Sequence, residues 1–261
     1  MNAYAVVTGA SGGLGKYIAI ELAKRKYNIL LLARSVDAMD TLKKELVKTY
    51  GVEVLVLGSD LSQVGDVVEV GRYCASLNLP ICILVNNAGY GLWGNFEELA
   101  LSEQQNMIDL NIKTLTTLTY QLLPFLQKNQ KAYILQIAST AAYQAVPTLA
   151  VYAATKAYVL SFSRSLYHEL KPQGIHVTCV CPGPMDTGFT DRAGMQALAH
   201  LSQQYNMDPE TVAQIAVKSM LKGKLEVVPG VMNKLQKLGD WLLPKKIVER
   251  IAARLYRNNT P

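Results

Sequence analysis

The chain is poor in cysteine and lacks long apolar runs, and both absences narrow its class. Its four cysteines, Cys74, Cys82, Cys179 and Cys181, include no Cys-x-x-Cys spacing, so neither a zinc site nor a redox pair is indicated. Three of them fall in apolar, strand-like runs, which predicts free thiols in a reducing compartment. No apolar run approaches the roughly 18 residues of a spanning helix. The N-terminus has no basic region followed by an apolar one, so we expect no signal peptide and a cytoplasmic protein.

Short β-rich runs alternate with segments of helical period. Half of the 261 residues are hydrophobic, enough for one α/β domain whose sheet is covered on both faces. The alternation predicts a doubly wound, parallel, seven-stranded sheet with right-handed crossovers. We expect strands at 4–8, 28–33, 53–57, 81–85, 132–138, 175–181 and 225–228. We expect helices near 14–26, 37–50, 63–78, 102–127 and 151–171.

The segment Tyr152-Ala-Ala-Thr-Lys156 is the most informative motif of the chain. A helix places positions four residues apart on one face, so the phenol and the ammonium lie close together. The ammonium favours the phenolate, which lowers the tyrosine pKa toward the working pH. Such a pair suits proton donation to a carbonyl group that receives a hydride. Ser139 and Asn111 lie upstream of this pair. Taken alone, Ser139 would be interpreted as a strand-end cap and Asn111 as a polar helix residue.

A glycine-rich turn opens the chain, with the sequence Thr8-Gly-Ala-Ser-Gly-Gly-Leu-Gly15. It follows the apolar stretch 3–7 and precedes an amphipathic helix, which is the setting of a dinucleotide fingerprint. Glycine lets the backbone turn sharply and approach a pyrophosphate, and the helix N-terminus offers free N–H groups to it. The turn therefore predicts a nucleotide site.

Together these motifs resemble the short-chain dehydrogenase/reductase superfamily, in its compact single-domain branch. The resemblance covers residues 3 to about 190 and implies a Rossmann fold. It is closest to NADP-dependent reductases of often unassigned substrate, and more distant from ketosteroid and 3-oxoacyl-CoA reductases. The motifs that carry it are Thr-Gly-x-x-x-Gly-x-Gly at 8–15, Asn86-Asn87-Ala88-Gly89, Asn111, Ser139, Tyr152-x-x-x-Lys156 and Pro182-Gly183-x-x-x-Thr187.

The resemblance also implies roles for individual residues. Tyr152 would donate or accept the proton, Lys156 would lower its pKa and hold the nicotinamide ribose, and Ser139 would bind the carbonyl oxygen. Asn111 would anchor a water that leads protons to Lys156, and Thr187 would meet the nicotinamide carboxamide. The implied cofactor-binding set is Gly9, Ser11, Gly13, Leu14, Gly15, Arg34, Asp60, Leu61, Asn87, Ala88, Gly89, Tyr152, Lys156, Pro182, Gly183 and Thr187.

The end of the second expected strand indicates the cofactor. An NAD-preferring fold usually places an acid there, whereas this chain has Ala33 and Arg34. A guanidinium can bind a 2′-phosphate, so we expect NADP(H) to be preferred over NAD(H). The less favoured alternative is that Arg34 is a solvated cation near a helix start. The second basic residue that NADP-preferring relatives often carry is replaced by Gly12. Asp60 is either an adenine contact or the N-cap of the next helix.

The substrate end is less specified. Tyr90, Trp93, Tyr143, Met185 and Phe189 either line an apolar pocket or are ordinary packing residues. We expect a helical lid at about 186–225 and a hydrophobic carbonyl substrate. The expected substrate contacts are Ser139, Tyr143, Tyr152 and Met185.

The C-terminal segment 233–257 holds seven Lys or Arg against two acids, so it carries five of the six net positive charges. Two apolar stripes, separated by Pro244, predict a pair of basic amphipathic helices beyond a catalytic domain at 1–232. Such a pair either lies on a membrane surface or covers the domain or a dimer contact. No nucleic-acid-binding module is present.

The sequence thus predicts an NADP(H)-dependent oxidoreductase that acts on a small carbonyl or alcohol compound without a metal. Two alternatives remain open: a non-catalytic NADP(H)-binding regulator, and a dehydrogenase that works in the oxidative direction. We also expect a homodimer or homotetramer, because the helices near 102–127 and 151–171 carry more leucine than one sheet contact needs.

Overall fold

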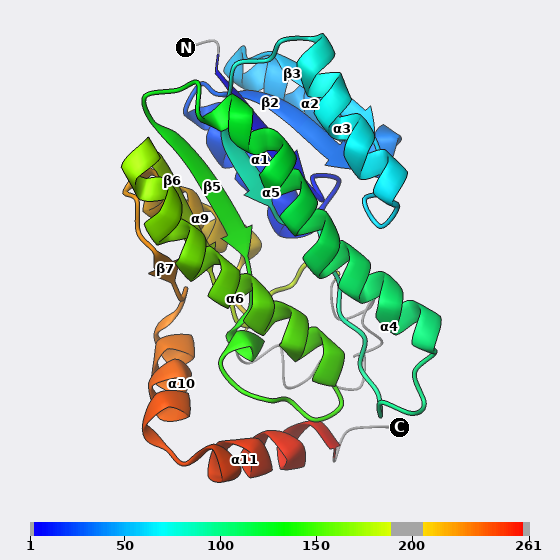
Figure 1. Cartoon of the computed structure of the whole chain (residues 1–261), viewed down its shortest axis with the longest axis vertical. Coiled ribbons are helices and arrows are strands. Elements are labelled where there is room, and N and C mark those ends of the chain that lie inside the picture. Colours follow the sequence, from blue (N-terminus) through cyan, green and yellow to red (C-terminus); the bar gives the residue numbers. More distant parts are fainter. Residues whose placement is uncertain (1–2, 189–205, 258–261) are drawn as a thin grey trace.

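The computed structural model describes residues 3–188 and 206–257 of the chain. Within them, seven parallel strands form one sheet in the order β3-β2-β1-β4-β5-β6-β7 (Figure 1). The order reverses direction between β1 and β4, which is where ligands bind in open parallel sheets. The strands are β1 (Tyr4–Thr8), β2 (Asn28–Ala33), β3 (Val54–Gly58), β4 (Ile81–Asn86), β5 (Ala132–Ile137), β6 (Ile175–Val180) and β7 (Glu226–Val227). This confirms the predicted doubly wound α/β fold.

The helices cover both faces of the sheet. Successive residues of a strand point to opposite faces, and in β1 the side chains of Ala5 and Val7 enter one apolar core while Tyr4 and Val6 enter the other. The first core lies under α1 (Gly13–Lys24), α2 (Val36–Tyr50) and α9 (Pro209–Leu221). The second lies under α3 (Val64–Ser76), α5 (Leu115–Leu126) and α6 (Ala150–Leu170).

The long helix expected at 102–127 has an irregular centre. It consists of α4 (Leu101–Ile108), a π-helical turn (Asp109–Thr114) and α5. π-turns inside helices are rare and are frequent at functional sites. Short 3₁₀ turns occupy Thr140–Ala142 and Lys171–Gln173.

Helix α9 (Pro209–Leu221) lies within the segment 186–225, where we expected a lid, and it corrects that prediction. Asp208 caps this helix by accepting a hydrogen bond from the backbone N–H of Thr211 at 2.9 Å, and Pro209 occupies its first turn. Its apolar side, including Val212 and Val217, is fully buried against the sheet beside α1. The residues 209–221 are thus a permanent layer of the fold, and 189–205 lie outside the described residues.

The C-terminal segment forms the two expected helices, α10 (Val231–Leu242) and α11 (Lys245–Arg257), with Pro244 between them. Figure 1 shows both helices below the end of the sheet to which the strands lead. One carboxylate ties α10 to the domain, since Glu226 of β7 accepts hydrogen bonds from Lys237 of α10 and from Arg164 of α6. Within the described ranges, no helix is both long and apolar enough to cross a bilayer.

The leucines that motivated an oligomer are mostly part of the protomer core. Leu115, Leu118 and Leu122 of α5 are buried, as are Leu160 and Leu170 of α6. The premise of surplus apolar surface is therefore wrong for these five residues: Leu118, Leu122 and Leu170 belong to the second core, and Leu115 and Leu160 to a smaller cluster with Val159. Exposed aromatic groups remain on this face, where Tyr120 of α5 and Tyr158 of α6 are accessible to solvent.

Candidate active site

One large cavity, of about 1370 Å³, opens at the carboxyl ends of the strands. It collects nearly all the described residues that the sequence singled out, from seven separate segments of the chain. Those lining it are Gly9, Ser11, Gly13, Leu14, Arg34, Asp60, Leu61, Asn87, Ala88, Gly89, Tyr90, Ser139, Tyr152, Lys156, Pro182, Gly183, Met185 and Thr187. Such convergence at the switch point is what a shared ligand site requires.

The glycine turn is packed so tightly that a side chain has no room at Gly9 or Gly15. Gly9 and Gly13 have φ angles of 64° and 51°, in the left-handed region that favours glycine. A Cβ atom on Gly15 would lie 2.3 Å from the carbonyl oxygen of Gly9, so α1 packs directly against the turn. The turn therefore leaves its backbone open to the cavity, as an approach to a pyrophosphate requires.

The end of β4 holds the turn in place. The side-chain amide of Asn87 donates to the carbonyl oxygens of Thr8 and Gly9 at 3.0 and 3.3 Å. The backbone N–H groups of Asn87 and Ala88 both donate to the hydroxyl of Thr8, at 2.9 and 3.0 Å. These bonds join β1 to β4 across the switch point and fix the geometry of the nucleotide end.

Asn111 lies in the π-helical turn, behind the cavity wall rather than in it. Its side-chain oxygen accepts from the backbone N–H of Tyr90, and its amide donates to the carbonyl oxygen of Tyr90 and the hydroxyl of Thr155. A Cβ atom on Gly89 would lie 2.8 Å from that oxygen and 3.5 Å from the Lys156 ammonium nitrogen. Asn111 thus clamps the segment after β4 against α6, and the clamp passes directly beside Lys156.

Ser139, Tyr152 and Lys156 all face the large cavity. Ser139 follows β5, and its hydroxyl accepts a hydrogen bond from the backbone N–H of Ala141 at 3.2 Å, so the hydroxyl proton can point elsewhere. Tyr152 and Lys156 lie one helical turn apart on α6, with the ammonium nitrogen 5.7 Å from the centre of the phenol ring. The i, i+4 geometry expected from the sequence is present.

Lys156 is buried and donates to the carbonyl oxygen of Ile137 at 3.0 Å. Burial disfavours the charged ammonium and lowers the pKa of Lys156 to about 8. This lysine can therefore gain and lose a proton near neutral pH, which an exposed lysine cannot do.

The far end of the cavity is lined by Arg34, Ser35, Asp60 and Leu61, which follow β2 and β3. Asp60 does not cap α3, since its carboxylate accepts from the N–H and hydroxyl of Ser62, at 3.1 and 2.8 Å. Arg34 is exposed at the rim. A side chain added at Gly12 would meet no atom within 4 Å, so this position has space for the cation that it lacks.

The residues expected at the substrate end separate into two groups. Tyr90 and Met185 line the cavity, while Trp93 packs with Met107 and Leu149 in a small core beside it. The structure corrects the prediction that Tyr143 contacts the substrate. This residue is absent from the cavity wall, and its hydroxyl donates a hydrogen bond to Glu226 at 2.6 Å. Phe189 lies outside the described residues.

The part of the cavity wall that the sequence did not predict comes from α10 and α11. Nine of their residues, and Leu243 between the two helices, line the large cavity: Met232, Asn233, Leu235, Gln236, Gly239, Asp240, Leu243, Val248, Ile251 and Ala252. Gly183 explains how close they come, since a Cβ atom there would lie 2.4 Å from the side-chain oxygen of Asn233. The helical periodicity of the segment was visible in the sequence, but its position over the site was not.

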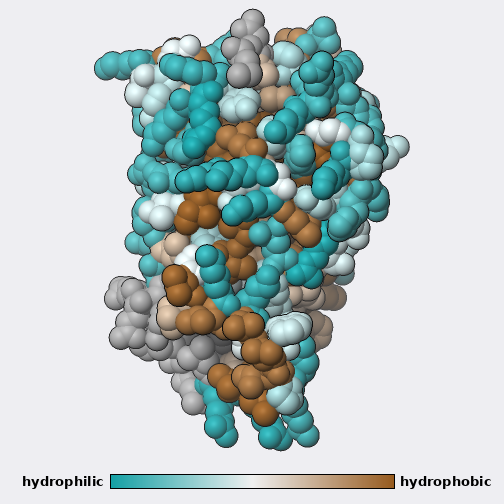
Figure 2. Space-filling model, turned by 90° about the vertical axis from the view of Figure 1, so that its left-hand side faces the viewer, coloured by the Kyte–Doolittle hydropathy of each residue, from teal (hydrophilic) through white to brown (hydrophobic). Residues whose placement is uncertain are grey.

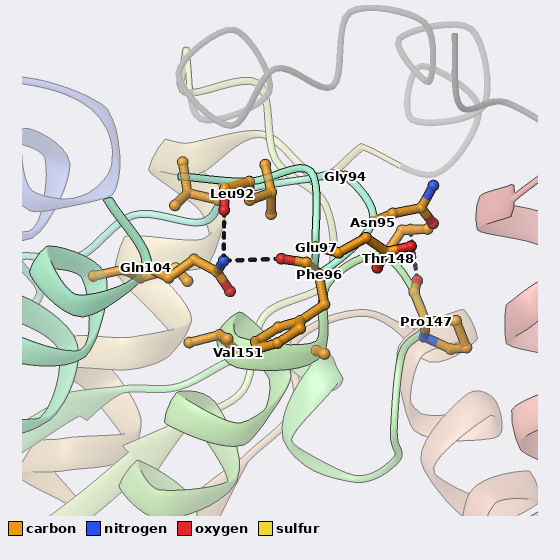
Figure 3. A pocket seen from close by; sticks show the side chains of 12 residues that line it. Leu92, Gly94, Asn95, Phe96, Glu97, Gln104, Pro147, Thr148 and Val151 are labelled. Carbon is orange, nitrogen blue, oxygen red and sulfur yellow. Dashed lines mark hydrogen bonds between the residues drawn. The ribbon is translucent and has the colours of Figure 1, made fainter. Parts of the chain in front are cut away.

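A smaller cavity of about 210 Å³ lies beside the large one, between the loop before α4 and the start of α6 (Figure 3). Gln104 borders it and donates to the carbonyl oxygens of Phe96 and Leu99, at 3.1 and 2.9 Å. Leu92 lines both cavities. Neither the glycine turn nor Lys156 lines the small cavity, so this cavity is not part of the nucleotide end of the site.

Known proteins resemble this chain in sequence. The family model for short chain dehydrogenases matches residues 3–198. Very-long-chain 3-oxoacyl-CoA reductase of Anas platyrhynchos is 38% identical over 187 residues, which are 70% of this chain and 59% of that protein. 17-beta-hydroxysteroid dehydrogenase type 3 of Mus musculus is 33% identical over 193 residues, 73% of this chain and 62% of that protein. The chain thus matches less than two thirds of the length of these curated relatives.

Solved structures of other proteins also resemble this chain, in both fold and sequence. A short-chain dehydrogenase from Sphingobium yanoikuyae in complex with NADPH has a TM-score of 0.82 and 28% identity, covering 91% of this chain and 92% of that one. The bulky-bulky ketone specific alcohol dehydrogenase from Comamonas testosteroni has a TM-score of 0.77 and 27% identity, covering 93% of each chain. The chain belongs to the short-chain dehydrogenase/reductase family.

Proposed function

We propose that the protein is an NADPH-dependent reductase of hydrophobic ketones or aldehydes. The observation that carries this proposal is the convergence of Ser139, Tyr152 and Lys156 with the glycine turn on one cavity. The turn, the N-terminus of α1 and residues 87–89 suit a dinucleotide, since all three line the same cavity at the carboxyl ends of β1 and β4. When bound, the nicotinamide supplies the hydride that reduces the carbonyl carbon.

The side chains around the carbonyl group then have distinct tasks. The Ser139 hydroxyl donates to the carbonyl oxygen and binds it more strongly as negative charge develops there. Tyr152 gives its phenolic proton to that oxygen. The Lys156 ammonium stabilises the resulting phenolate, and the lowered pKa of Lys156 lets it return a proton near neutral pH.

Asn111 would position neighbouring groups and would not itself contact the substrate or the cofactor. Its side-chain groups are already bonded to Tyr90 and Thr155, so a water leading to Lys156 would use the backbone of the π-helical turn. Thr187 reaches across to the glycine turn, where a Cβ atom on Gly13 would lie 3.2 Å from that of Thr187. This position suits a hydroxyl that meets the nicotinamide carboxamide.

The preference for NADPH is the finer part of the proposal. Arg34 follows β2, where an acid would repel a 2′-phosphate, and it lines the cavity. Two similar structures contain NADPH, those from Sphingobium yanoikuyae and the L-sorbose reductase of Gluconobacter frateurii. The hydrophobic substrate class is supported by the apolar wall that α10 and α11 contribute and by the ketones and acyl compounds in the names of similar proteins.

A second candidate function is a nucleotide-binding protein without turnover. One relative, 33% identical over 189 residues, is named Inactive hydroxysteroid dehydrogenase-like protein 1 of Homo sapiens, so membership of the family does not by itself imply activity. In this chain the tyrosine and the lysine are both present and face one cavity. The catalytic proposal is therefore preferred. Cofactor ratios, not the site, would set whether the same residues work in reduction or oxidation.

The test is a set of ketones, aldehydes and 3-oxoacyl thioesters, each incubated with the protein and NADPH while cofactor absorbance is followed. We expect consumption with apolar carbonyl compounds and little with sugars. NADPH binding without consumption of any carbonyl substrate would favour the non-catalytic candidate. Light scattering tests the proposed homodimer or homotetramer, for which the exposed Tyr120 and Tyr158 offer a surface.

A further inference from the structure

Helix α10 turns its apolar side away from the protein. The side that faces the domain carries the buried polar residues Asn233 and Asp240. The apolar stripe, whose members lie three or four residues apart, is exposed and consists of Val231, Leu235, Leu238 and Leu242. A helix that covers a soluble domain has the opposite arrangement, with the apolar stripe inward. Leu235 also lines the large cavity, but the rest of the stripe is exposed among the residues that the structure describes, and this exposure indicates a site for a partner.

The stripe belongs to a larger surface, here named the apolar rim. Figure 2 shows apolar side chains gathered over the lower part of one face, where α10 and α11 lie in Figure 1. Trp241 is 77% exposed, so a large amphipathic ring projects from this surface. The rim consists of Val231, Met232, Leu235, Leu238, Trp241, Leu242, Leu243, Ile247 and Ile251. A contiguous apolar surface of this kind marks an interaction site.

The charges around the rim select the partner. Five exposed cations flank it, Lys234, Lys245, Lys246, Arg250 and Arg254. A second copy of the chain, related by a two-fold axis, would place the same cationic surface against itself, which like charges oppose. An anionic lipid surface instead complements the cations, and it accepts the leucines and the tryptophan at its interface.

The rim also continues into the active-site cavity. Met232, Leu235, Leu243 and Ile251 are largely exposed and at the same time line the large cavity. These four side chains thus form an apolar path from the outer surface toward Tyr152. A surface that faces lipid would open this cavity toward the bilayer rather than toward water.

We propose that the apolar rim docks on the anionic surface of a bilayer and that carbonyl compounds dissolved in the bilayer enter the cavity between α10 and α11. This inference rests on the proposed reductase function for its second half only. The first half concerns lipid binding, and it can be tested without any measurement of catalytic activity.

The first experiment measures binding of the full chain to vesicles of phosphatidylcholine with and without phosphatidylglycerol. We expect co-sedimentation with the anionic vesicles at low salt, and at least a tenfold loss when the salt is raised to about 0.5 M, because the charges are screened. The chain has two tryptophans, and Trp93 is buried, so a blue shift of fluorescence on adding vesicles reports Trp241. Trp241→Phe should remove that shift.

Matched variants separate docking through the apolar rim from nonspecific adsorption to vesicles. Leu238→Ser/Trp241→Ser/Leu242→Ser changes the rim without touching a residue of the cavity wall, and should reduce vesicle binding about tenfold or more. Val47→Ser/Leu77→Ser, at exposed apolar positions elsewhere, should leave it unchanged. Lys246→Glu/Arg250→Glu should weaken binding to anionic vesicles, and Lys44→Glu/Lys48→Glu on α2 should not.

Two outcomes would overturn docking. One is the absence of co-sedimentation with anionic vesicles at low salt. The other is a wild-type dimer that the triple rim variant converts to monomer, which would make the rim an interface between copies. Melting curves of each variant exclude loss of the fold as the cause.

The second experiment tests entry from the bilayer. With a long-chain ketone held in vesicles, the triple rim variant should lose most of its kcat/KM, while with a small water-soluble ketone it should equal the wild type. Equal losses on both substrates, or on neither, would contradict entry through the rim. No activity on any substrate would instead contradict the reductase proposal and leave the vesicle-binding result standing.

Discussion

The nucleotide end and the tail end of the cavity are built in opposite ways. At the nucleotide end, hydrogen bonds between side-chain and backbone groups of Asn87 and Thr8 fix the glycine turn, and a side chain added at Gly9 or Gly15 would collide with its neighbours. At the tail end, α10 meets the domain through a few polar groups and exposes its leucines. The first arrangement holds one ligand in one pose, whereas the second can admit apolar molecules of different shape. Changes at the two ends should therefore alter different properties.

The largest expected effect lies where the two ends meet. Tyr152→Phe removes the proposed proton donor and leaves the glycine turn untouched, so turnover should fall by about 10² to 10⁴ while NADPH binding changes little. Steady-state kinetics and a fluorescence titration of NADPH check the two halves. Wild-type kcat in this variant, with hydride transfer limiting the rate, would exclude Tyr152 as the acid.

The nucleotide end should resist even one added methyl group. Gly15→Ala would place Cβ 2.3 Å from the carbonyl oxygen of Gly9, so we expect more than a tenfold loss of NADPH affinity and a lower melting temperature. Gly12→Ala is the matched control, because nothing lies within 4 Å of that Cβ position. If both variants bound NADPH equally, the close packing of α1 on the turn would not matter for binding.

Cofactor choice should shift by a smaller amount. Arg34→Ala should reduce the preference for NADPH over NADH by ~1.5–3 kcal/mol, the worth of a charge-assisted hydrogen bond. Gly12→Arg should increase the preference, since the position is open and has an extended backbone, with φ at −173°. Titrations with both cofactors measure the difference. Equal affinities in the wild type would remove the basis for NADP(H).

The pKa of Lys156 predicts a pH limb. Because the buried ammonium has a pKa of about 8, kcat/KM for reduction in the free enzyme should fall as the pH rises above that value. Lys156→Arg keeps a charge at high pH, so its lower activity should lack this limb. A limb at the same pH in the variant would assign it to another group.

The smallest effect is expected at the tail end. Asp240 is 5% exposed, lines the cavity and has an oxygen without a hydrogen-bond partner among the described residues. Burial raises its pKa against the opposing charge of Lys245, so the folded state holds the proton more tightly than the unfolded state. The ionised carboxylate then costs stability above the raised pKa, and this cost disappears below the usual value of 3.8.

Asp240→Asn should accordingly raise the melting temperature at pH 7 by a few degrees, and the gain should vanish near pH 3.8. Glu45→Gln, at an exposed position of α2, is the control and should change little. A gain of equal size at both pH values would show that charge is not its cause.

How well the sequence predicted the structure differs between the same two ends. The glycine turn and the pair Tyr152 and Lys156 depend on local geometry, namely a strand-helix junction and a four-residue spacing, so both could be predicted. The strands were predicted to within about two residues, because their apolar runs are bounded by polar turns. Asn111 was identified by resemblance, but the π-helical turn that turns its side chain toward Tyr90 has no sequence signal.

The tail end required tertiary information. Helical periodicity predicted α10 and α11. Which face of α10 meets the domain depends on hydrogen bonds of Asn233, Glu226 and Lys237, and an apolar stripe in the sequence does not predict such polar contacts. Tyr143 was misassigned for the same reason, since its partner Glu226 lies on β7. Helix α9 was mistaken for part of a lid although Asp208 and Pro209 form a standard helix start.

The contact between Asn233 and Gly183 has a thermodynamic consequence. The backbone of Gly183 lines the cavity, and the side chain of Asn233 of α10 lies so close that a Cβ atom on Gly183 would be 2.4 Å from its oxygen, so we expect a shift of the helix to move this backbone. Any ligand that changes the position of α10 then changes the affinity for the cofactor, and linkage requires the converse by the same factor. Vesicles that alter the dissociation constant of NADPH by a given ratio must have their own affinity altered by that ratio when NADPH is bound. The two ends would then communicate through a single glycine that cannot accept a side chain.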